Sequence, residues 1–508
     1  MDKIIRHKKL FLKVVVLLLS FTFIALILNK FYSSKPKTIV LTKNGFSPAG
    51  IKIKQGTTVR FVSKIGKPFW PASDLHPSHA LYPEFDPKRA LKENEVWEFR
   101  FEKLGSFRFH DHISPMYRGT IIVVSEDTPS LKGDFVSDFS FTECKEIKDF
   151  DQKRDCFSNI LQDIVLKKGP DITFDFVKKL RDEDPDFAAE CHTIVHSLGE
   201  VSYWKYAKDK KLPKTGKISY CGFGYIHGFM QELGHHSRDF VGEVKPICDH
   251  FSEKLNYDNY ERTVNPSDQC YHGVGHGLAF FYVPDFPYDI TEAIKRSASD
   301  CQELTNDDVE VSNCTYGIFG GISSMYIGGH GIQIPVDEKN PFKVCNSQED
   351  YLKDACFDSL VPVLGVMWNM DMERLSQTFS TIDEIYQKQS FYNLGDLASR
   401  WFAMGYVKVD LVYKSCRYLG SVARQSCFNG FSEGLIRNSF PKTAPLDALG
   451  FCRSSILTSS EKYKCEAGFL SEMKLVHPDK IKGTLSQFTK EEMNVVCEDE
   501  RIIEYCKE

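Results

Sequence analysis

The sequence predicts a multidomain chain: an N-terminal transmembrane helix, then an all-β Greek-key sandwich, then an all-α, disulfide-rich helical repeat domain. Three observations predict this order. They are an apolar run behind a basic start, period-two alternation over residues 38–126, and sixteen cysteines that all lie at or after Cys144. The 508 residues suffice for two or three domains that each bury a core. The net charge of −5 favours no nucleic-acid partner.

The N-terminus has the pattern of an uncleaved membrane anchor. Residues 1–9 are basic overall, and the apolar run of residues 10–28 carries a single charge, Lys13. Because each helical residue rises by about 1.5 Å, this run nearly covers the ~30 Å hydrocarbon layer. The Asn-Lys-Phe-Tyr-Ser-Ser that follows is a poor cleavage site. We therefore expect a single-pass cell-membrane protein with residues 1–9 in the cytoplasm, residues 10–29 as the anchor and the bulk of the chain extracytoplasmic.

A short linker at residues 30–37 leads into an all-β domain at residues 38–126. Its apolar and polar residues alternate with the period of half-buried strands, and no helical stripe interrupts them. The alternating segments are residues 51–54, 58–62, 96–101 and 106–109. Such short strands separated by turn residues predict a Greek-key sandwich or barrel.

Both ends of this domain carry motifs of a known family. Gly45-Phe46-Ser47-Pro48 is followed by Ile51, Ile53, Gly56, Val59 and Phe61, and the far end has Gly105, a Phe-x-Phe-His strand and Gly119-Thr120-Ile121-Ile122-Val123. Residues 38–126 resemble the cupredoxins, the plastocyanin-like proteins, and are similar to the cupredoxin-like modules of exported bacterial iron-uptake proteins. The resemblance implies copper bound through His, Cys, His and usually Met.

The sequence departs from the family at each of those ligand positions. Phe69, Asp111, Ser114 and Tyr117 stand where the family has His, Cys, His and Met, and no cysteine precedes Cys144. Because a blue copper site depends on a thiolate, we expect no blue centre here.

Histidines near these positions suggest a different site. His76 and His79 lie in the loop that the family folds over its metal pole, and His110 and His112 lie opposite. Imidazole and carboxylate donors suit Cu(II), Zn or Ni. The candidate ligands are His76, His79, His110, Asp111 and His112, with Met116 as a weaker candidate. In the alternative interpretation the histidines are exposed loop residues and Asp111 caps a turn.

The geometry of this site makes a demand on the strand. In strand phase Phe107, Phe109 and Asp111 share one face. His110 and His112 can converge with Asp111 only if the strand ends or bends there.

After a linker at residues 127–140, the sequence pattern of residues 141–508 is that of an α-helical domain. Segments 172–180 and 290–298 carry apolar residues at three- and four-residue spacing. Five phrases begin with a cysteine and carry glycine three positions later, namely Gly224, Gly273, Gly317, Gly430 and Gly468. A small residue one turn into a helix allows close approach of a neighbouring helix, so we expect stacked helical hairpins.

The cysteines of this region predict disulfides. An extracytoplasmic compartment is oxidising, and no Cys-x-x-Cys motif is present. Several cysteines are spaced evenly at eleven to thirteen residues, and local pairs such as Cys144 with Cys156 and Cys301 with Cys314 are expected. The cysteines assigned to disulfides are Cys144, Cys156, Cys301, Cys314, Cys345, Cys356, Cys416, Cys427, Cys452, Cys465, Cys497 and Cys506. The partners of Cys191, Cys221, Cys248 and Cys270 stay open.

The helical region has a second set of histidines. His192 and His196, like His272 and His276, are four residues apart and so share a helix face, and His227 lies between these pairs in the sequence. Histidines from several helices can hold Zn or Fe in the core of a bundle. The alternative is that buried neutral histidines bridge backbone carbonyls. His235, His236, His250 and His330 are interpreted as surface or cap residues, and Glu200 and Glu232 as the carboxylates to test as a general base.

The sequence supports three hypotheses for function. The first is metal handling or redox chemistry at the sandwich pole, with copper as the expected cofactor. The second is a non-metal cell-surface scaffold, and the third is a metalloenzyme that uses the helical histidines. A non-enzymatic role is favoured, since no phosphate loop or dinucleotide motif is present, and the Gly-x-Ser-x-Gly around Ser432 falls on predicted helix. The membrane is the expected partner, and no protein partner is indicated.

Overall fold

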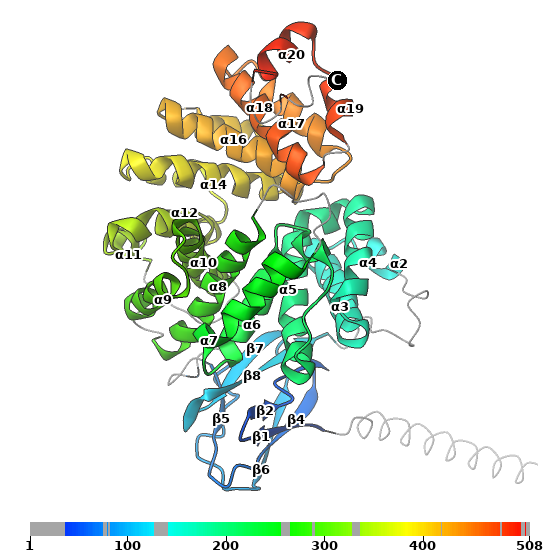
Figure 1. Cartoon of the computed structure of the whole chain (residues 1–508), viewed down its shortest axis with the longest axis vertical. Coiled ribbons are helices and arrows are strands. Elements are labelled where there is room, and N and C mark those ends of the chain that lie inside the picture. Colours follow the sequence, from blue (N-terminus) through cyan, green and yellow to red (C-terminus); the bar gives the residue numbers. More distant parts are fainter. Residues whose placement is uncertain are drawn as a thin grey trace, which may run out of the picture.

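The structure is a computed structural model in which a β-sandwich at one end supports a tall stack of helices (Figure 1). It describes residues 36–74, 79, 82–125, 141–255, 265–286, 290–327, 336–417, 419–477, 480–498 and 503. Within these residues, no helix combines the length and apolarity that crossing a bilayer requires. The anchor predicted at residues 10–29 lies outside them, as does the linker at residues 127–140.

The N-terminal strands form two four-stranded sheets, which makes the fold a sandwich. The strands are β1 (Lys37–Thr42), β2 (Gly45–Ser47), β3 (Gly50–Lys54), β4 (Thr57–Ser63), β5 (Pro71–Ser73), β6 (Val96–Phe101), β7 (Gly105–Asp111) and β8 (Ser114–Val124). One sheet has the order β2-β1-β4-β6 and the other β3-β8-β7-β5. The β1–β4 and β3–β8 pairs are parallel and the others antiparallel. The four segments that alternate in the sequence all lie within strands.

Aromatic rings fill the space between the two sheets. Phe61 of β4 and Phe109 of β7 are fully buried, with ring centroids 5.5 Å apart. Phe46 packs on Phe109 at 4.8 Å. Burying such rings supplies most of the hydrophobic stabilisation that a small sandwich has.

The other face of the β3-β8-β7-β5 sheet is covered by helices. Strand β7 alternates in sequence like a half-buried strand, yet its last five residues are all buried. Arg108, which the alternation assigns to solvent, is only 4% exposed. The half-buried interpretation of this strand is therefore wrong, because the helical domain packs on the face that the sequence pattern leaves polar.

The rest of the described chain is helical. The longer helices are α3 (Phe150–Lys168), α4 (Pro170–Glu183), α5 (Pro185–Asp209), α6 (Gly224–His236), α7 (Phe240–Asp249), α8 (Pro266–Tyr282), α9 (Ile290–Leu304), α10 (Asp308–Ile327), α12 (Asp350–Met367), α14 (Glu384–Ala403), α16 (Ser421–Asn438), α17 (Ala444–Cys452) and α18 (Ser459–Val476). The shorter ones are α2 (Thr142–Glu146), α11 (Lys343–Asn346), α13 (Met372–Phe379), α15 (Val409–Cys416), α19 (Ile481–Leu485) and α20 (Lys490–Val496). Short 3-10 or π turns lie at Gly216–Ser219, His250–Lys254 and Val283–Asp285.

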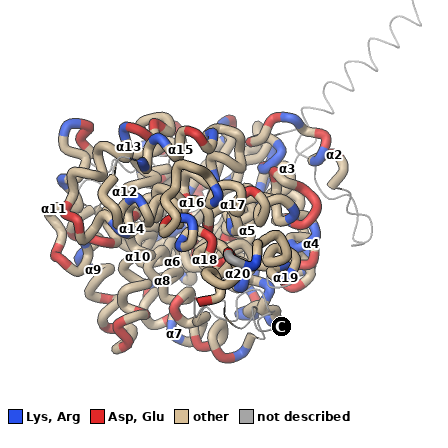
Figure 2. The backbone as a smooth tube through the Cα atoms, turned by 90° about the horizontal axis from the view of Figure 1, so that it is seen from above, with Lys and Arg blue, Asp and Glu red and all other residues tan. Residues whose placement is uncertain are grey.

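The long helices pack side by side in chain order. Each of α5, α6, α8, α10, α12, α14, α16 and α18 contacts the next. Helix α5 also contacts α14 and α16, so the row curls back on itself (Figure 2).

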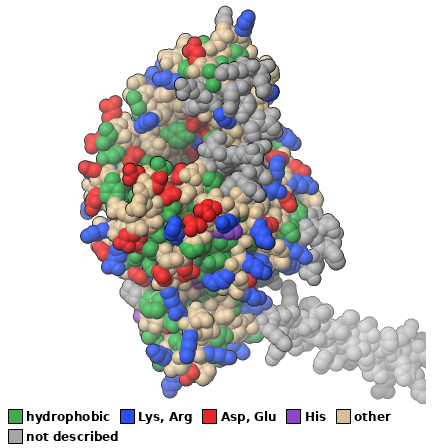
Figure 3. All heavy atoms as spheres, viewed as in Figure 1, with side chains coloured by type: hydrophobic (Ala, Val, Ile, Leu, Met, Phe, Trp, Pro, Cys, Tyr) green, Lys and Arg blue, Asp and Glu red, His purple; other side chains and the backbone are tan. Residues whose placement is uncertain are grey.

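On the face drawn in Figure 3, acidic and basic side chains of the described residues are interspersed.

The repeated glycines allow these helices to approach closely, as the sequence predicts. A Cβ built on Gly317 of α10 would lie 1.9 Å from the backbone oxygen of His272 in α8. One built on Gly430 of α16 would lie 2.0 Å from the backbone oxygen of Tyr392 in α14. Both distances are far shorter than a van der Waals contact, so only glycine fits.

Most of the disulfides among the described residues join the first turns of a long helix to the segment before it, and Cys191–Cys221 joins α5 to the segment before α6. Within the described residues the pairs are Cys144–Cys156, Cys191–Cys221, Cys248–Cys270, Cys301–Cys314, Cys345–Cys356, Cys416–Cys427 and Cys452–Cys465. The evenly spaced pairs of the sequence are among them, and the four cysteines left open pair with their chain neighbours. A partner for Cys497 at Cys506 lies outside the described residues.

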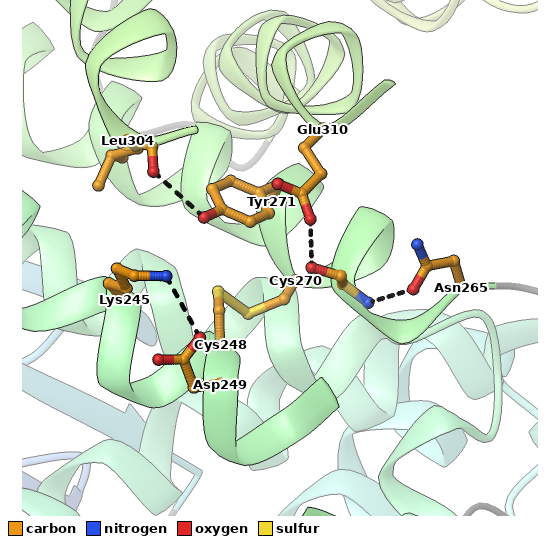
Figure 4. The surroundings of a disulfide bond; sticks show 9 residues. Lys245, Cys248, Asp249, Asn265, Cys270, Tyr271, Leu304 and Glu310 are labelled. Atoms are coloured by element: carbon orange, nitrogen blue, oxygen red, sulfur yellow. Dashed lines mark hydrogen bonds and ion pairs between the residues drawn. A yellow bond between two sulfur atoms is a disulfide. The ribbon is translucent and has the colours of Figure 1, made fainter. Parts of the chain in front are cut away.

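The Cys248–Cys270 bridge shows how these links are supported. It ties the end of α7 to the first turns of α8 (Figure 4). Beside it, the Tyr271 hydroxyl donates to the Leu304 carbonyl at 3.4 Å, and the Ser267 hydroxyl donates to Glu310 at 2.5 Å. The bridge and these bonds hold α7, α8 and the α9–α10 connection together, and α8 carries two of the histidines discussed below.

Candidate metal centre

The end of β7 delivers two histidines to the pole of the sandwich. The β7–β8 register shifts between His110 and Asp111, so the strand is irregular at the position where the sequence analysis requires a bend. His110 pairs with Ala72 of β5, and the backbone N–H of His112 donates to the Trp70 carbonyl at 2.7 Å. The two imidazoles are thereby held beside the loop that follows β5.

That loop contributes the third histidine. His79 is buried, and its backbone adopts a left-handed conformation with φ of 53°. This conformation costs a non-glycine residue of order 1–3 kcal/mol, so the surrounding contacts must maintain it. The imidazole ring of His79 provides two of these contacts. Nδ1 lies 2.6 Å from Asp86 Oδ2, and Nε2 lies 2.9 Å from His112 Nδ1.

The three imidazoles form one compact cluster. One ring nitrogen from each of His79, His110 and His112 lies within 4.8 Å of the others. The ring centroid of His79 is 5.4 Å from that of His110 and 4.8 Å from that of His112. Three convergent nitrogens at these separations can share one ion after a small movement of the rings.

Two buried carboxylates orient this cluster. Asp86 accepts from the Trp70 indole N–H at 2.8 Å and contacts His79 Nδ1, and the Trp70 ring packs on His112 at 4.5 Å. Asp74 Oδ1 lies 2.8 Å from His110 Nδ1. With Nδ1 engaged by a carboxylate, Nε2 of His79 and of His110 is the ring atom suited to a metal.

The electrostatics favour neutral imidazoles at His79 and His112. Burial lowers the pKa of His79, against the hydrogen bond to Asp86 that raises it, and burial also lowers the pKa of His112. Burial alone raises the pKa of Asp74, but the hydrogen bond with His110 and the guanidinium charges of Arg118 and Arg108 act in the opposite direction, and the net pKa is lowered. His79 and His112 therefore present neutral nitrogen, which is the form of imidazole that binds metal.

Asp111 does not join the three imidazoles in this cluster. Asp111 is fully buried, and its Oδ1 accepts from the backbone N–H of Trp70 at 2.6 Å and of Ile113 at 3.4 Å. Burial raises its pKa. Asp111 therefore caps the loop, as in the alternative interpretation of the sequence, and its prediction as a ligand is corrected. Met116 is exposed, and His76 falls outside the described residues.

The structure also shows what stands at the ligand positions of the cupredoxin pattern. Phe69 is fully buried in the sandwich core, and the Tyr117 ring lies 4.3 Å from the guanidinium of Arg238. Together with the backbone role of Asp111, these contacts show that the family ligand set does not fit a copper ion here. The residues that do converge are the three imidazoles.

The sequence pattern does not single out Asp74, Asp86 or Trp70. Asp74 follows β5 and Asp86 lies in an irregular loop, so neither belongs to a motif. Trp70 follows Phe69, which stands where the cupredoxin pattern has its first His. Only the packing of the loop over the pole reveals their role.

The pole is linked to the helical domain through α6. His235 Nδ1 lies 3.7 Å from Asp74 Oδ2, and its Nε2 lies 3.3 Å from the Gly119 carbonyl. His236 Nε2 lies 2.9 Å from Glu232 Oε2. The surface assignment of His235 and His236 is therefore wrong, because the sheet docks on this helix and buries them. His250 does lie at the C-terminal end of α7, and His330 is outside the described residues.

The helical histidines also come together. His192 and His196 lie on α5, His227 on α6, and His272 and His276 on α8. One ring nitrogen from each of His227, His272 and His276 lies within 4.8 Å of the others. The rings of α5 lie against this set, since the His227 centroid is 5.5 Å from that of His192 and 6.1 Å from that of His196.

The two carboxylates put forward for testing as a general base have structural contacts. Glu232 is fully buried against Arg108, and Glu200 lies 3.9 Å from the same guanidinium. The Ser432 hydroxyl donates to the Asn429 carbonyl within α16, where no strand precedes it. The structure thus places Glu232 at the domain contact.

No family model matches the chain. No curated protein matches it either.

Among solved structures, the chain is similar to cupredoxins over a limited segment. An oxidised amicyanin mutant is 16% identical, with 18% of this chain and 82% of that chain covered and a TM-score of 0.15. A purple cupredoxin from Nitrosopumilus maritimus is 20% identical, with 17% and 99% covered and a TM-score of 0.16. A Cu-containing nitrite reductase from Thermus scotoductus is 25% identical, with 18% and 23% covered and a TM-score of 0.16. These likenesses concern a cupredoxin-like segment alone, and the assignment of ligands rests on the geometry above.

Proposed function

We propose that this protein is a membrane-anchored, extracytoplasmic metal-binding protein whose sandwich holds a copper ion, in metal handling or redox chemistry. The observation that carries the proposal is the convergence of His79, His110 and His112 within 4.8 Å. Two of these imidazoles have a buried aspartate at Nδ1, which is the arrangement that orients histidine ligands in metal sites.

The donor set favours copper among the common divalent ions. Three neutral imidazoles suit Cu(II), Zn and Ni, and Cu(II) binds nitrogen sites most tightly of the first-row divalent metals. Because the sandwich contains no cysteine, the copper has no thiolate ligand and no blue colour. Zn and Ni are the alternative ions that suit the same donors.

Three protein ligands leave a coordination position open. His112 is the half-buried member of the cluster, and the other two are buried. A site with an open position can exchange its ion or bind an external ligand, whereas four protein ligands close it. The open position therefore favours a role in metal handling or redox chemistry over a purely structural role for the ion.

The proposed location rests on the sequence of residues 1–29 and on the disulfides. Protease added to intact spheroplasts of an expressing cell should degrade the chain beyond residue 30 and leave a short membrane-bound fragment. Full protection until lysis would contradict the proposed orientation.

Metal analysis of the full chain tests the site itself. After loading with copper and removal of loose ions, the wild type should show a Cu(II) electron-paramagnetic-resonance signal with nitrogen couplings and no intense thiolate absorption. The double variant His79→Gln/His112→Gln should lose the sandwich component of this signal and bind one copper ion fewer per chain than the wild type. The variant Met116→Ala is the control and should retain both. A wild type that holds no copper, zinc or iron at the sandwich, or a double variant that binds as the wild type does, would refute the proposal.

A further inference from the structure

Five imidazoles from three helices meet in the helical domain. The ring centroids of His227 and His276 are 4.9 Å apart, as are those of His227 and His272, and His272 and His276 are 5.1 Å apart. His196 lies 6.1 Å from His276. His192 lies 5.5 Å from His227 and completes the group. Histidines seldom gather in such numbers for packing alone, because each buried ring nitrogen requires a partner.

One of these nitrogens has no such partner among the described residues. His227 is 5% exposed, and its Nε2 makes no hydrogen bond within the described part of the chain. It lies in the group whose ligand atoms are within 4.8 Å of one another, with nitrogens of His272 and His276. A buried nitrogen without a partner is destabilising, and a bound ion would satisfy it.

Other rings of the group make hydrogen bonds to residues outside it. His192 Nδ1 lies 2.9 Å from the Cys221 carbonyl, and His272 has a backbone hydrogen bond with Asn313. His276 Nδ1 lies 2.9 Å from the side-chain amide of Gln231. That amide can present its oxygen, in which case Nδ1–H donates and Nε2 is the ligand atom. Nε2 of His276 and Nε2 of His272 already lie 3.3 Å apart.

The alternative role for these histidines was to bridge backbone carbonyls between close-packed helices. His192 does so through Cys221, but His227 Nε2 does not. The glycines around the group make room for the rings: a Cβ on Gly320 would lie 2.9 Å from His276 Nε2, and one on Gly228 would lie 1.9 Å from the His196 carbonyl. The close approach of the helices is thus arranged around the imidazoles.

The site is rich in imidazole nitrogen. His227 and His276 are buried, with exposed fractions of 5% and 6%. The carboxylate of Glu200 lies 3.8 Å from His196 Nδ1. Imidazole donors select copper, zinc, nickel or iron over calcium and magnesium, which require oxygen ligands.

A cavity gives this group an opening. A space of about 550 Å³ is lined by His272 and by residues of α10, α12, α14 and α16, among them Tyr316, Asp358, Tyr392 and Arg437. An ion can enter through it, and a small polar molecule in the cavity can reach the ion beside His272.

We infer that the helical domain holds a second divalent transition-metal ion through His227, His272 and His276, with His192 and His196 as further donors. This site is independent of the copper site proposed for the sandwich. It requires no residue of the β-domain, and each site can be tested after the other is removed.

Stoichiometry in the full chain tests the inference, with Co(II) and Cu(II) as probes. The wild type should bind two ions per chain, and His227→Gln/His272→Gln should bind one, with the Cu(II) resonance of the sandwich unchanged. His250→Gln is the control: it removes one half-buried histidine that contacts the Pro213 carbonyl outside both groups, and it should bind two. A folded His227→Gln/His272→Gln protein with undiminished stoichiometry would overturn the inference.

A second arm covers the case in which that variant does not fold. The sandwich variant His79→Gln/His112→Gln retains all five helical imidazoles and should bind one Co(II) ion per chain. Addition of the ion should raise the melting temperature of this variant. Binding of no ion by this protein would overturn the inference, and would leave the sandwich proposal intact if the wild type binds one. If instead the wild type binds one ion in the helices and no copper in the sandwich, the sandwich proposal fails and the inference stands. The failures of the two proposals are therefore distinguishable.

Discussion

Glu232 of α6 and Arg108 of β7 form a buried ion pair, 3.1 Å long, at the contact between the sandwich and the helical domain. Their side chains are 0% and 5% exposed. Glu232 also accepts from the Thr120 hydroxyl at 3.1 Å, so α6 is bonded to both central strands of the sheet. Burial alone raises the pKa of Glu232, but the guanidinium charge of Arg108 and the contact with His236 outweigh it and hold the pKa below its usual range.

Replacing Arg108 should destabilise the docked state strongly. Arg108→Met leaves the Glu232 carboxylate buried without its counter-charge, which costs about 3–5 kcal/mol. The exposed pair Arg60–Glu98, at 2.7 Å, is the matched control, and Arg60→Met should cost less than about 1 kcal/mol. Urea unfolding of both variants measures the difference. Equal losses for the two would mean that the buried pair does not hold the domains together.

The aspartates behind the sandwich histidines should tune metal affinity. Asp86→Asn and Asp74→Asn each replace a carboxylate at an imidazole Nδ1 by a neutral amide of the same shape. Loss of such a partner weakens metal binding by about 10–100-fold. Competition with a copper chelator measures the affinity, and Asp163→Asn, which changes the partner of Lys52 away from the pole, serves as control. Unchanged affinity in both aspartate variants would remove these residues from the site.

Two glycines should respond oppositely to alanine. Gly317→Ala places a methyl group 1.9 Å from the His272 carbonyl, so α8 and α10 must separate, at a cost of about 3 kcal/mol or more. Gly450→Ala in α17 meets nothing within 4 Å and should stabilise the helix by about 0.5–1 kcal/mol. Thermal unfolding separates the two outcomes. A neutral Gly317→Ala would contradict the close helix contact.

His477 should contribute to loss of stability in acid. It follows α18, is 6% exposed, and its pKa is lowered to about 2 by burial and by the charges of Arg181 and Lys480. Because the folded pKa lies below the unfolded value of about 6.5, the unfolded chain gains a proton that the folded chain does not. Stability therefore falls by up to about 1.4 kcal/mol per pH unit as pH decreases below 6.5.

The variant His477→Gln checks this dependence. Its unfolding free energy should fall less steeply between pH 6 and pH 4 than that of the wild type, by up to one proton. His250→Gln provides the comparison, since His250 is less buried and bonds to the Pro213 carbonyl. Identical slopes for wild type and His477→Gln would show that His477 is protonated in the folded protein.

The predictions that depended on neighbours along the chain agree with the structure. Alternation identified the strands around Phe61 and Phe109, and glycine three residues after cysteine marked the close helix contacts at Gly317 and Gly430. The short cysteine spacings correspond to local bridges such as Cys144–Cys156. These signals are readable because a strand, a helix turn or a short loop brings residues of fixed separation together.

The sites depend on contacts that no local pattern encodes. The sequence by itself determined that histidines gather in two regions and that no thiolate stands in the sandwich. Only the tertiary structure decided that Asp86 and Asp74 lie behind His79 and His110, that Asp111 turns to the backbone, and that Arg108 is buried. For Arg108 the physical reason is the docking of one sheet face on α6, which buries a side chain that alternation assigns to water. For the aspartates it is hydrogen bonding at the sandwich pole between residues that are apart in the sequence.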